Sequence, residues 1–117
     1  MTKKTFNAIS IVAPNGTKII ECIKTIEVRS WRPRISIGED LVIIENKQYL
    51  NEENDFDENA IAIGIVKIKD VRIFEENDIK NACASYWCEG YFSWELDHVR
   101  KLENPQKAVA KKRDLSS

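Results

Sequence analysis

AIAIGIVKIKDVRIF, residues 60–74, is the longest strand-forming stretch of the chain and decides its fold. Most of its side chains are apolar or β-branched, and such residues fit the pleated, half-buried surface of a sheet. Gly64 lies within the run, where a glycine marks a bulge or a sharp bend that lets a sheet curl. The stretch therefore predicts a curled sheet of the kind that forms a small β-barrel.

Shorter strand and helix signals flank this stretch on both sides. Turn residues separate them, first Pro14 with Asn15-Gly16 and later Pro33 and Gly38. The predicted elements, in chain order, are strand 6–12, helix 16–24, strand 24–31, strand 40–45, strand 60–74, helix 77–87, strand 91–102 and a strand after Pro105. Mostly short strands in this order, with two or three short helices, predict a small α+β domain built on a partly closed β-barrel.

The chain of 117 residues has the length of one domain, so residues 1–117 are predicted to fold as a single unit. Hydrophobic residues make up 43% and charged residues 32% of the chain, which fits a soluble globular protein. The sequence has no apolar run of about 18 residues that would cross a membrane, and no signal-peptide pattern at its start. We therefore expect a cytoplasmic monomer that does not bind a membrane.

Cysteine and histidine are too few to form a zinc site. Cys22, Cys83 and Cys88 are odd in number, and His98 is the single histidine of the chain. Together they lack the paired ligand spacing that zinc sites use. We expect reduced and mostly buried thiols, no metal and no cofactor.

Charges of opposite sign gather in separate segments, although the formal net charge is only −1. An acidic loop is predicted at about 47–59, where residues 51–59 hold five acids and no base. A basic stretch at 100–113 holds six bases against the single acid Glu103. If this stretch meets the basic segment 24–34 in the fold, the two form a surface that attracts phosphates. The alternative is a solvated basic tail.

The basic segment 24–34, KTIEVRSWRPR, alternates like a half-buried strand. Its alternation puts Ile26 and Val28 on one face, which we expect to join the core. The opposite face then holds Glu27, Arg29 and Trp31. The second face is therefore either a solvated surface or a binding site.

Lys24, Glu27 and Arg29 together offer a constellation that a charged ligand can use. The guanidinium of Arg29 is a planar fork for a phosphate or a base edge, and Lys24 adds a compact cation. Glu27 accepts hydrogen bonds from an amino group or orders the two cations. The alternative is an exposed salt bridge that contributes only about 0–1 kcal/mol to stability.

The segment CIKTIEVR, residues 22–29, resembles the motif GxKxxExR of the ASCH domain family, a branch of the PUA-like superfamily of small β-barrels. Lys24, Glu27 and Arg29 match its three charged places. Cys22 departs from it, because glycine is usual at the first position and accepts a positive φ without strain. The resemblance extends to the strand around Gly64 and to the late strand YFSWELDHVRKL, and it implies a PUA-like barrel over nearly the whole chain.

The resemblance implies a link to RNA, because members are described as RNA-binding modules and a few as hydrolases of RNA or of acylated cytidine. If this chain is an enzyme, the resemblance implies catalytic roles for Lys24 and Glu27. The acyl-cytidine hydrolases pair the motif lysine with a threonine, and this chain has Glu27 in that place. The match to their mechanism is incomplete, so RNA or nucleotide binding is the leading hypothesis and a hydrolase is the alternative.

Aromatic and basic neighbours of the motif complete the predicted ligand site, because unpaired bases stack on such rings. Trp94 is expected in the core instead, since the strand that carries it must fill the barrel with one face. A third hypothesis is a protein-binding module that uses the stretch 100–113. The predicted residues for binding RNA or a nucleotide are Lys24, Glu27, Arg29, Trp31, Arg32 and Arg34.

Overall fold

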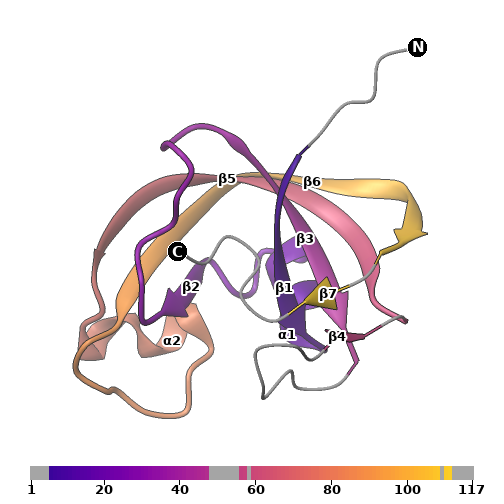
Figure 1. Cartoon of the computed structure of the whole chain (residues 1–117). Helices are drawn as coiled ribbons and strands as arrows, with labels where there is room; N and C mark the ends of the chain where they lie inside the picture. Colours follow the sequence, from indigo (N-terminus) through magenta and orange to yellow (C-terminus); the bar gives the residue numbers. More distant parts are fainter. Residues whose placement is uncertain (1–5, 48–55, 58, 109, 112–117) are drawn as a thin grey trace.

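Five strands hydrogen-bond side by side in one mixed sheet, and short helices pack against it (Figure 1). The computed structural model describes residues 6–47, 56–57, 59–108 and 110–111. The strands, in their order across the sheet, are β1 (Asn7–Val12), β3 (Asp40–Asn46), β5 (Ile61–Ile73), β6 (Phe92–Lys107) and β2 (Ile26–Arg29). β1 is parallel to β3, and the other neighbours are antiparallel. This is the small α+β fold that the sequence predicts.

The sheet curls because its two longest strands, β5 and β6, bend together across the molecule (Figure 1). Their pairing is irregular at three places, the first of them beside Gly64, and bulges bend a strand and raise its twist. A Cβ atom at Gly64 would collide with the Ile20 side chain of helix α1 (Asn15–Ile20) and lie 3.0 Å from the Arg100 carbonyl oxygen. The predicted bulge is therefore confirmed, and the glycine also lets α1 approach the sheet.

The main hydrophobic core lies inside the curl of the sheet. Trp94 is 0% exposed, which confirms its predicted place in the core. Its indole N–H donates a hydrogen bond of 3.2 Å to the Trp31 carbonyl oxygen, so the polar end of the ring is satisfied. The buried residues of this core are Ile9, Ile11, Ile19, Leu41, Ile43, Val66, Ile68, Trp94 and Leu96.

Helix α1 ends well before the limit of the predicted helix 16–24, in a left-handed turn at Cys22. The Cys22 N–H donates to the Ile19 carbonyl oxygen over 3.0 Å, and the Ile23 N–H donates to the Lys18 carbonyl oxygen over 2.9 Å. These two bonds form the Schellman motif, which usually has glycine at the left-handed position. The turn of the resembled motif is thus formed, although Cys22 must adopt a φ of +61°.

Helix α2 (Ile79–Ala82) follows the 3₁₀ turn η1 (Glu76–Asp78) and is shorter than the predicted helix 77–87. It ends at Cys83, whose φ of +52° cannot continue a right-handed helix. No helix in the described part of the chain is long and apolar enough to span a membrane.

The three cysteines are free thiols, and they are less buried than the sequence predicts. Cys22 and Cys88 are exposed, and Cys83 is half-buried. Two of them occupy the left-handed turns that end the helices, and such turns face outward.

Strand β6 runs through Pro105 as one strand where the sequence predicts two. Ala62 of β5 pairs with Gln106, but Gly64 pairs with Lys101, so β6 has extra residues between these two pairs. Pro105 lies among the extra residues and is not required to donate a ladder hydrogen bond. A proline is therefore tolerated inside this strand.

The described parts of the charged segments belong to different strands. Most of the predicted acidic loop at about 47–59 is outside the described residues, but Phe56–Asp57 forms β4 and pairs with β7 (Ala110–Lys111). The basic stretch 100–113 first continues β6, so this part is not a tail. The segment 24–34 contributes β2, which pairs with the opposite end of β6. The described part of the stretch 100–113 thus continues from the end of β6 that does not pair with β2.

Replacing Cys22 with glycine should stabilise the domain. A left-handed conformation costs a non-glycine residue roughly 1–2 kcal/mol. Glycine avoids this cost but lowers stability by about 0.5–1 kcal/mol, because its unfolded chain has more conformational entropy. We therefore expect the free energy of unfolding to rise by about 0.5–1 kcal/mol. Thermal unfolding should show a Tm higher by a few degrees for Cys22→Gly. Cys22→Ala keeps the Cβ atom and should show no gain. An unchanged or lower Tm for Cys22→Gly would mean that the turn is not strained.

Candidate functional site

Both faces of strand β2 are covered, which differs from the predicted half-buried strand. Ile26 packs with Phe74 and Ala82 in a small second core beneath α2. On the other face Glu27 pairs in register with Trp94, the residue at the centre of the main core. The second face is therefore not a solvated surface, because the curl of the sheet turns it inward.

The carboxylate of Glu27 bridges the two cations of the motif. Its Oε1 lies 3.3 Å from the Lys24 ammonium, and its Oε2 accepts a hydrogen bond of 2.7 Å from the Arg29 Nε. Lys24 and Glu27 are each only 7% exposed. The three charged residues of the motif are thus brought into one contact network, and breaking such a buried pair usually costs several kcal/mol.

Lys24 joins this network to helix α2. Its ammonium donates a hydrogen bond to the carbonyl oxygen of Ala82, at the C-terminal end of the helix. This end of a helix leaves carbonyl groups without intrahelical partners and carries partial negative charge. Lys24 therefore holds α2 against the start of β2, while Glu27 compensates its charge.

Arg29 bridges the two edge strands of the curled sheet. Besides Glu27, its guanidinium donates from Nη2 to the Ser10 carbonyl oxygen of β1 over 2.9 Å. β1 and β2 are the outer strands of the sheet and do not pair with each other. Because the Arg29 side chain is still 21% exposed, part of its guanidinium remains accessible from outside.

Guanidinium groups and aromatic rings alternate beside this bridge. The Arg29 guanidinium carbon lies 5.8 Å from the centre of the Trp31 ring, and the Arg32 guanidinium carbon lies 4.7 Å from the centre of the Phe92 ring. Arg29 and Phe92 are register partners, so the two stacked pairs are neighbours. Arg32 and Arg34 are exposed. We call Arg29, Trp31, Arg32 and Phe92 the stacked row.

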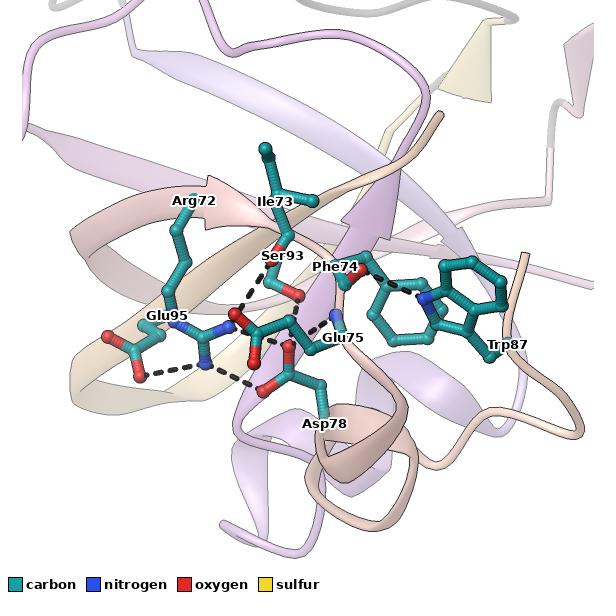
Figure 2. A network of polar contacts seen from close by, with 8 residues as sticks. All are labelled: Arg72, Ile73, Phe74, Glu75, Asp78, Trp87, Ser93 and Glu95. Carbon is teal, nitrogen blue, oxygen red and sulfur yellow. Dashed lines mark hydrogen bonds and ion pairs between the residues drawn. The ribbon is translucent and has the colours of Figure 1, made fainter. Parts of the chain in front are cut away.

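A second polar network lies on the opposite face of the sheet and was not predicted from the sequence (Figure 2). Arg72 donates two hydrogen bonds to the Asp78 carboxylate, at 2.6 and 2.7 Å. Asp78 also accepts from the Glu75 N–H at 2.9 Å and the Ser93 hydroxyl at 3.1 Å, and Arg72 reaches Glu95 at 3.4 Å. These bonds, above all that from Arg72, lower the pKa of Asp78 from 3.8 to about 2.

The sequence contains a signal for the role of Asp78 in this network but none for the role of Arg72. Asp78 stands just before a short helix, where an acid typically caps free N–H groups, and it forms a capping box with Glu75. Arg72 lies near the end of β5, and it meets Asp78 because the chain turns from β5 into η1. Among the described residues, no group of three or more His, Cys, Asp or Glu side chains is arranged to hold a metal ion.

Comparisons with known proteins agree with this architecture. The family model of the ASCH domain matches residues 9–106. The "Crystal structure of ASCH from Zymomonas mobilis" is 16% identical, has a TM-score of 0.62, and the match covers 86% of this chain and 71% of that chain. The structure of a point mutant of the Zymomonas mobilis protein is 14% identical, has a TM-score of 0.59, and the match covers 86% and 73% of the two chains. No curated protein matches the sequence. At these identities the solved structures show a shared PUA-like α+β fold.

The Asp78 network predicts a specific loss of stability in acid. Because the folded pKa of Asp78 is about 2 and its ordinary value is 3.8, the carboxylate stabilises the fold above pH 4, and this contribution disappears as pH falls from about 4 to about 2. A shift of this size corresponds to about 2 kcal/mol. Urea unfolding should therefore find Asp78→Asn less stable than the original protein by about 2–3 kcal/mol at pH 7.

The difference in unfolding free energy between Asp78→Asn and the original protein should narrow by about 2 kcal/mol when the urea unfolding is repeated near pH 2. Asp70→Asn is the matched control, since Asp70 is exposed and its carboxylate accepts a hydrogen bond from the neighbouring Val71 N–H. The unfolding free energy of Asp70→Asn should differ little from that of the original protein at both pH values. If the loss of stability in Asp78→Asn does not depend on pH, Asp78 does not form the ionised pair with Arg72.

Proposed function

The chain belongs to the ASCH domain family, and on this premise we propose that it is an RNA-binding module whose ligand is a single-stranded segment or a modified nucleotide. The observation that carries the proposal is the stacked row, in which each of two guanidinium groups lies over an aromatic ring. Unpaired bases stack on aromatic rings and on arginine planes, and phosphates accept hydrogen bonds from guanidinium N–H groups. The row supplies both contacts within a few residues.

Local charge supports the same ligand. Residues 24–34 hold four bases and one acid, which gives a formal charge of +3. That acid, Glu27, is buried and engaged by Lys24 and Arg29, so it presents little negative charge to a ligand. Arg32 and Arg34 are exposed on the same segment and add the screened attraction that polyanions experience.

Lys24 and Glu27 serve this site as positioning residues in the proposal. Both are almost fully buried, and each already has its partners inside the protein. Glu27 fixes the orientation of the Arg29 fork through the Nε hydrogen bond, and this leaves the Nη1 edge for a ligand. A pre-oriented fork loses little side-chain entropy on binding, which raises affinity.

Trp31 adds a donor that lacks an acceptor. Its indole N–H is shielded from solvent and has no hydrogen-bond partner among the described residues. An unsatisfied buried donor costs about 1–3 kcal/mol, and a phosphate or base carbonyl close to Arg29 can supply the missing acceptor after a small ring movement. This supports a ligand on the Trp31 side of the row.

The hydrolase alternative requires Lys24 or Glu27 to act on a substrate. The ammonium of Lys24 is bonded to Ala82 and Glu27, so it must leave both partners before its nitrogen can attack or accept a proton. Binding is therefore the function that the geometry supports best. Incubation with short RNAs and acylated cytidines, followed by chromatography, tests the alternative: turnover that disappears in a folded Glu27→Gln variant would favour an enzyme.

Removing exposed arginines of the segment should weaken RNA binding in a salt-dependent way. Fluorescence anisotropy with short single-stranded RNAs at about 50 mM salt should show binding that weakens as salt rises, because phosphate contacts release counterions. Arg34→Ala should lower the slope of log affinity against log salt by about 0.7, the value for one phosphate contact on a single strand. Arg32→Ala should show this loss and also weaken binding at every salt concentration, since it removes a stacking plane.

Arg100→Ala is the matched control for these variants. Arg100 is an exposed arginine on the far part of β6 and is paired with Asp40, so its removal changes the net charge equally. Its salt slope should equal that of the original protein. If no RNA binds, or if all three variants have the same effect, the proposed binding surface is wrong.

A further inference from the structure

A polar pocket of about 220 Å³ lies where β2, β5, β6 and α2 meet, on the face opposite the stacked row. Its charged and polar side chains come from elements far apart in the sequence. They are Thr25, Lys69, Arg72, Asn81 and Glu95. Nothing in the RNA-binding proposal uses this pocket.

Lys69 enters the pocket from a bulge. Its neighbours Ile68 and Asp70 pair with Leu96 and Glu95, so Lys69 is the extra residue of β5 and has no register partner on β6. Bulges redirect side chains and are frequent next to binding sites. The Lys69 ammonium has no hydrogen bond or ion pair to any described residue, and it is available to a ligand.

Glu95 supplies the opposite charge at a fixed place. Its Oε1 lies 3.4 Å from Arg72, and its side chain is 33% exposed, so the second carboxylate oxygen is open (Figure 2). Arg72 cannot easily move toward Glu95, because Asp78 holds it through two short hydrogen bonds. The carboxylate of Glu95 is therefore oriented by Arg72 through one oxygen only.

Thr25 and Asn81 add two uncharged polar groups to the lining. Their backbones are fixed, because the Thr25 N–H donates to the Asn81 carbonyl oxygen over 2.8 Å and the Leu96 N–H donates to the Thr25 carbonyl oxygen over 3.0 Å. Their side chains have no partner within the described part of the chain. The pocket thus combines a rigid backbone with a free hydroxyl and a free amide.

We propose that this pocket binds a small zwitterion of the amino-acid class, with its carboxylate toward Lys69 and its ammonium toward Glu95. Two cations face one anion in the lining, and Asp78 behind Arg72 brings the sum to zero, so a dipolar ligand fits better than an ion of either sign. A volume of about 220 Å³ suits a ligand of amino-acid size.

Two rival ligands fit the lining less well. A free phosphate would approach Glu95, whose charge repels it, and Arg72 is already neutralised by Asp78. A nucleobase needs a flat apolar or aromatic surface for stacking, but the lining side chains are mostly charged or polar and none is aromatic. A lining that holds both the unpaired cation of Lys69 and the carboxylate of Glu95 favours the zwitterion.

The test is an NMR titration of the full chain with free serine and glutamine. Backbone amide signals of Thr25, Lys69 and Asn81 should shift and saturate at millimolar concentrations. N-acetylserine lacks the ammonium and serine amide lacks the carboxylate, so each should bind at least tenfold more weakly. Lys69→Gln and Glu95→Gln should each weaken serine binding at least tenfold, whereas Lys80→Gln, an exposed lysine of α2 outside the lining, should not.

Three results would overturn the proposal. They are the absence of saturable shifts up to about 50 mM serine, equal binding of serine and its two blocked forms, and tighter binding of phosphate or cytosine than of serine. Thermal melts of each variant show whether it is folded, and Arg72 keeps its Asp78 partner in Glu95→Gln, so that variant should retain the fold. A failed RNA titration does not bear on this pocket, because the stacked row lies on the other face.

Discussion

The buried carboxylate of Glu27 is the interaction on which the rest of the structure depends. It compensates Lys24, which holds the end of α2, and it fixes Arg29, which connects β2 to β1. An isolated charge in this position would be strongly unfavourable, and the network is stable because every member has a close partner. One acid thus joins both edges of the curled sheet to a helix.

This arrangement divides the family motif into a buried part and an accessible part. Lys24 and Glu27 are buried and hold the fold together. Arg29 is partly exposed and Arg32 is exposed, while the rings of Trp31 and Phe92 are half-buried against the main core. The proposed binding role therefore falls on residues next to those that hold the fold together. Lys24 contacts α2, Arg29 contacts β1, and Glu27 lies between these two cations and compensates their charge.

Alternation and glycine placement in the sequence were enough to predict the strands, the bend at Gly64 and the burial of Trp94. They did not predict that Glu27 faces the core, because the curl that turns this face inward depends on pairing with β6. The Arg72–Asp78 pair was missed because the face of β5 that holds Arg72 depends on the irregular pairing of this strand with β6. Helix ends were predicted too late, since Cys22 and Cys83 are unusual residues for left-handed turns.

A double-mutant cycle on RNA affinity tests most directly whether Glu27 acts through Arg29. Affinities for one short single-stranded RNA at fixed salt are measured for the original protein, Glu27→Gln, Arg29→Lys and the double variant, each shown to be folded. We expect each single variant to weaken binding about tenfold, and the double variant to lose no more affinity than the more severe of the two single variants. Independent effects that multiply in the double variant, or single variants that bind normally, would contradict it.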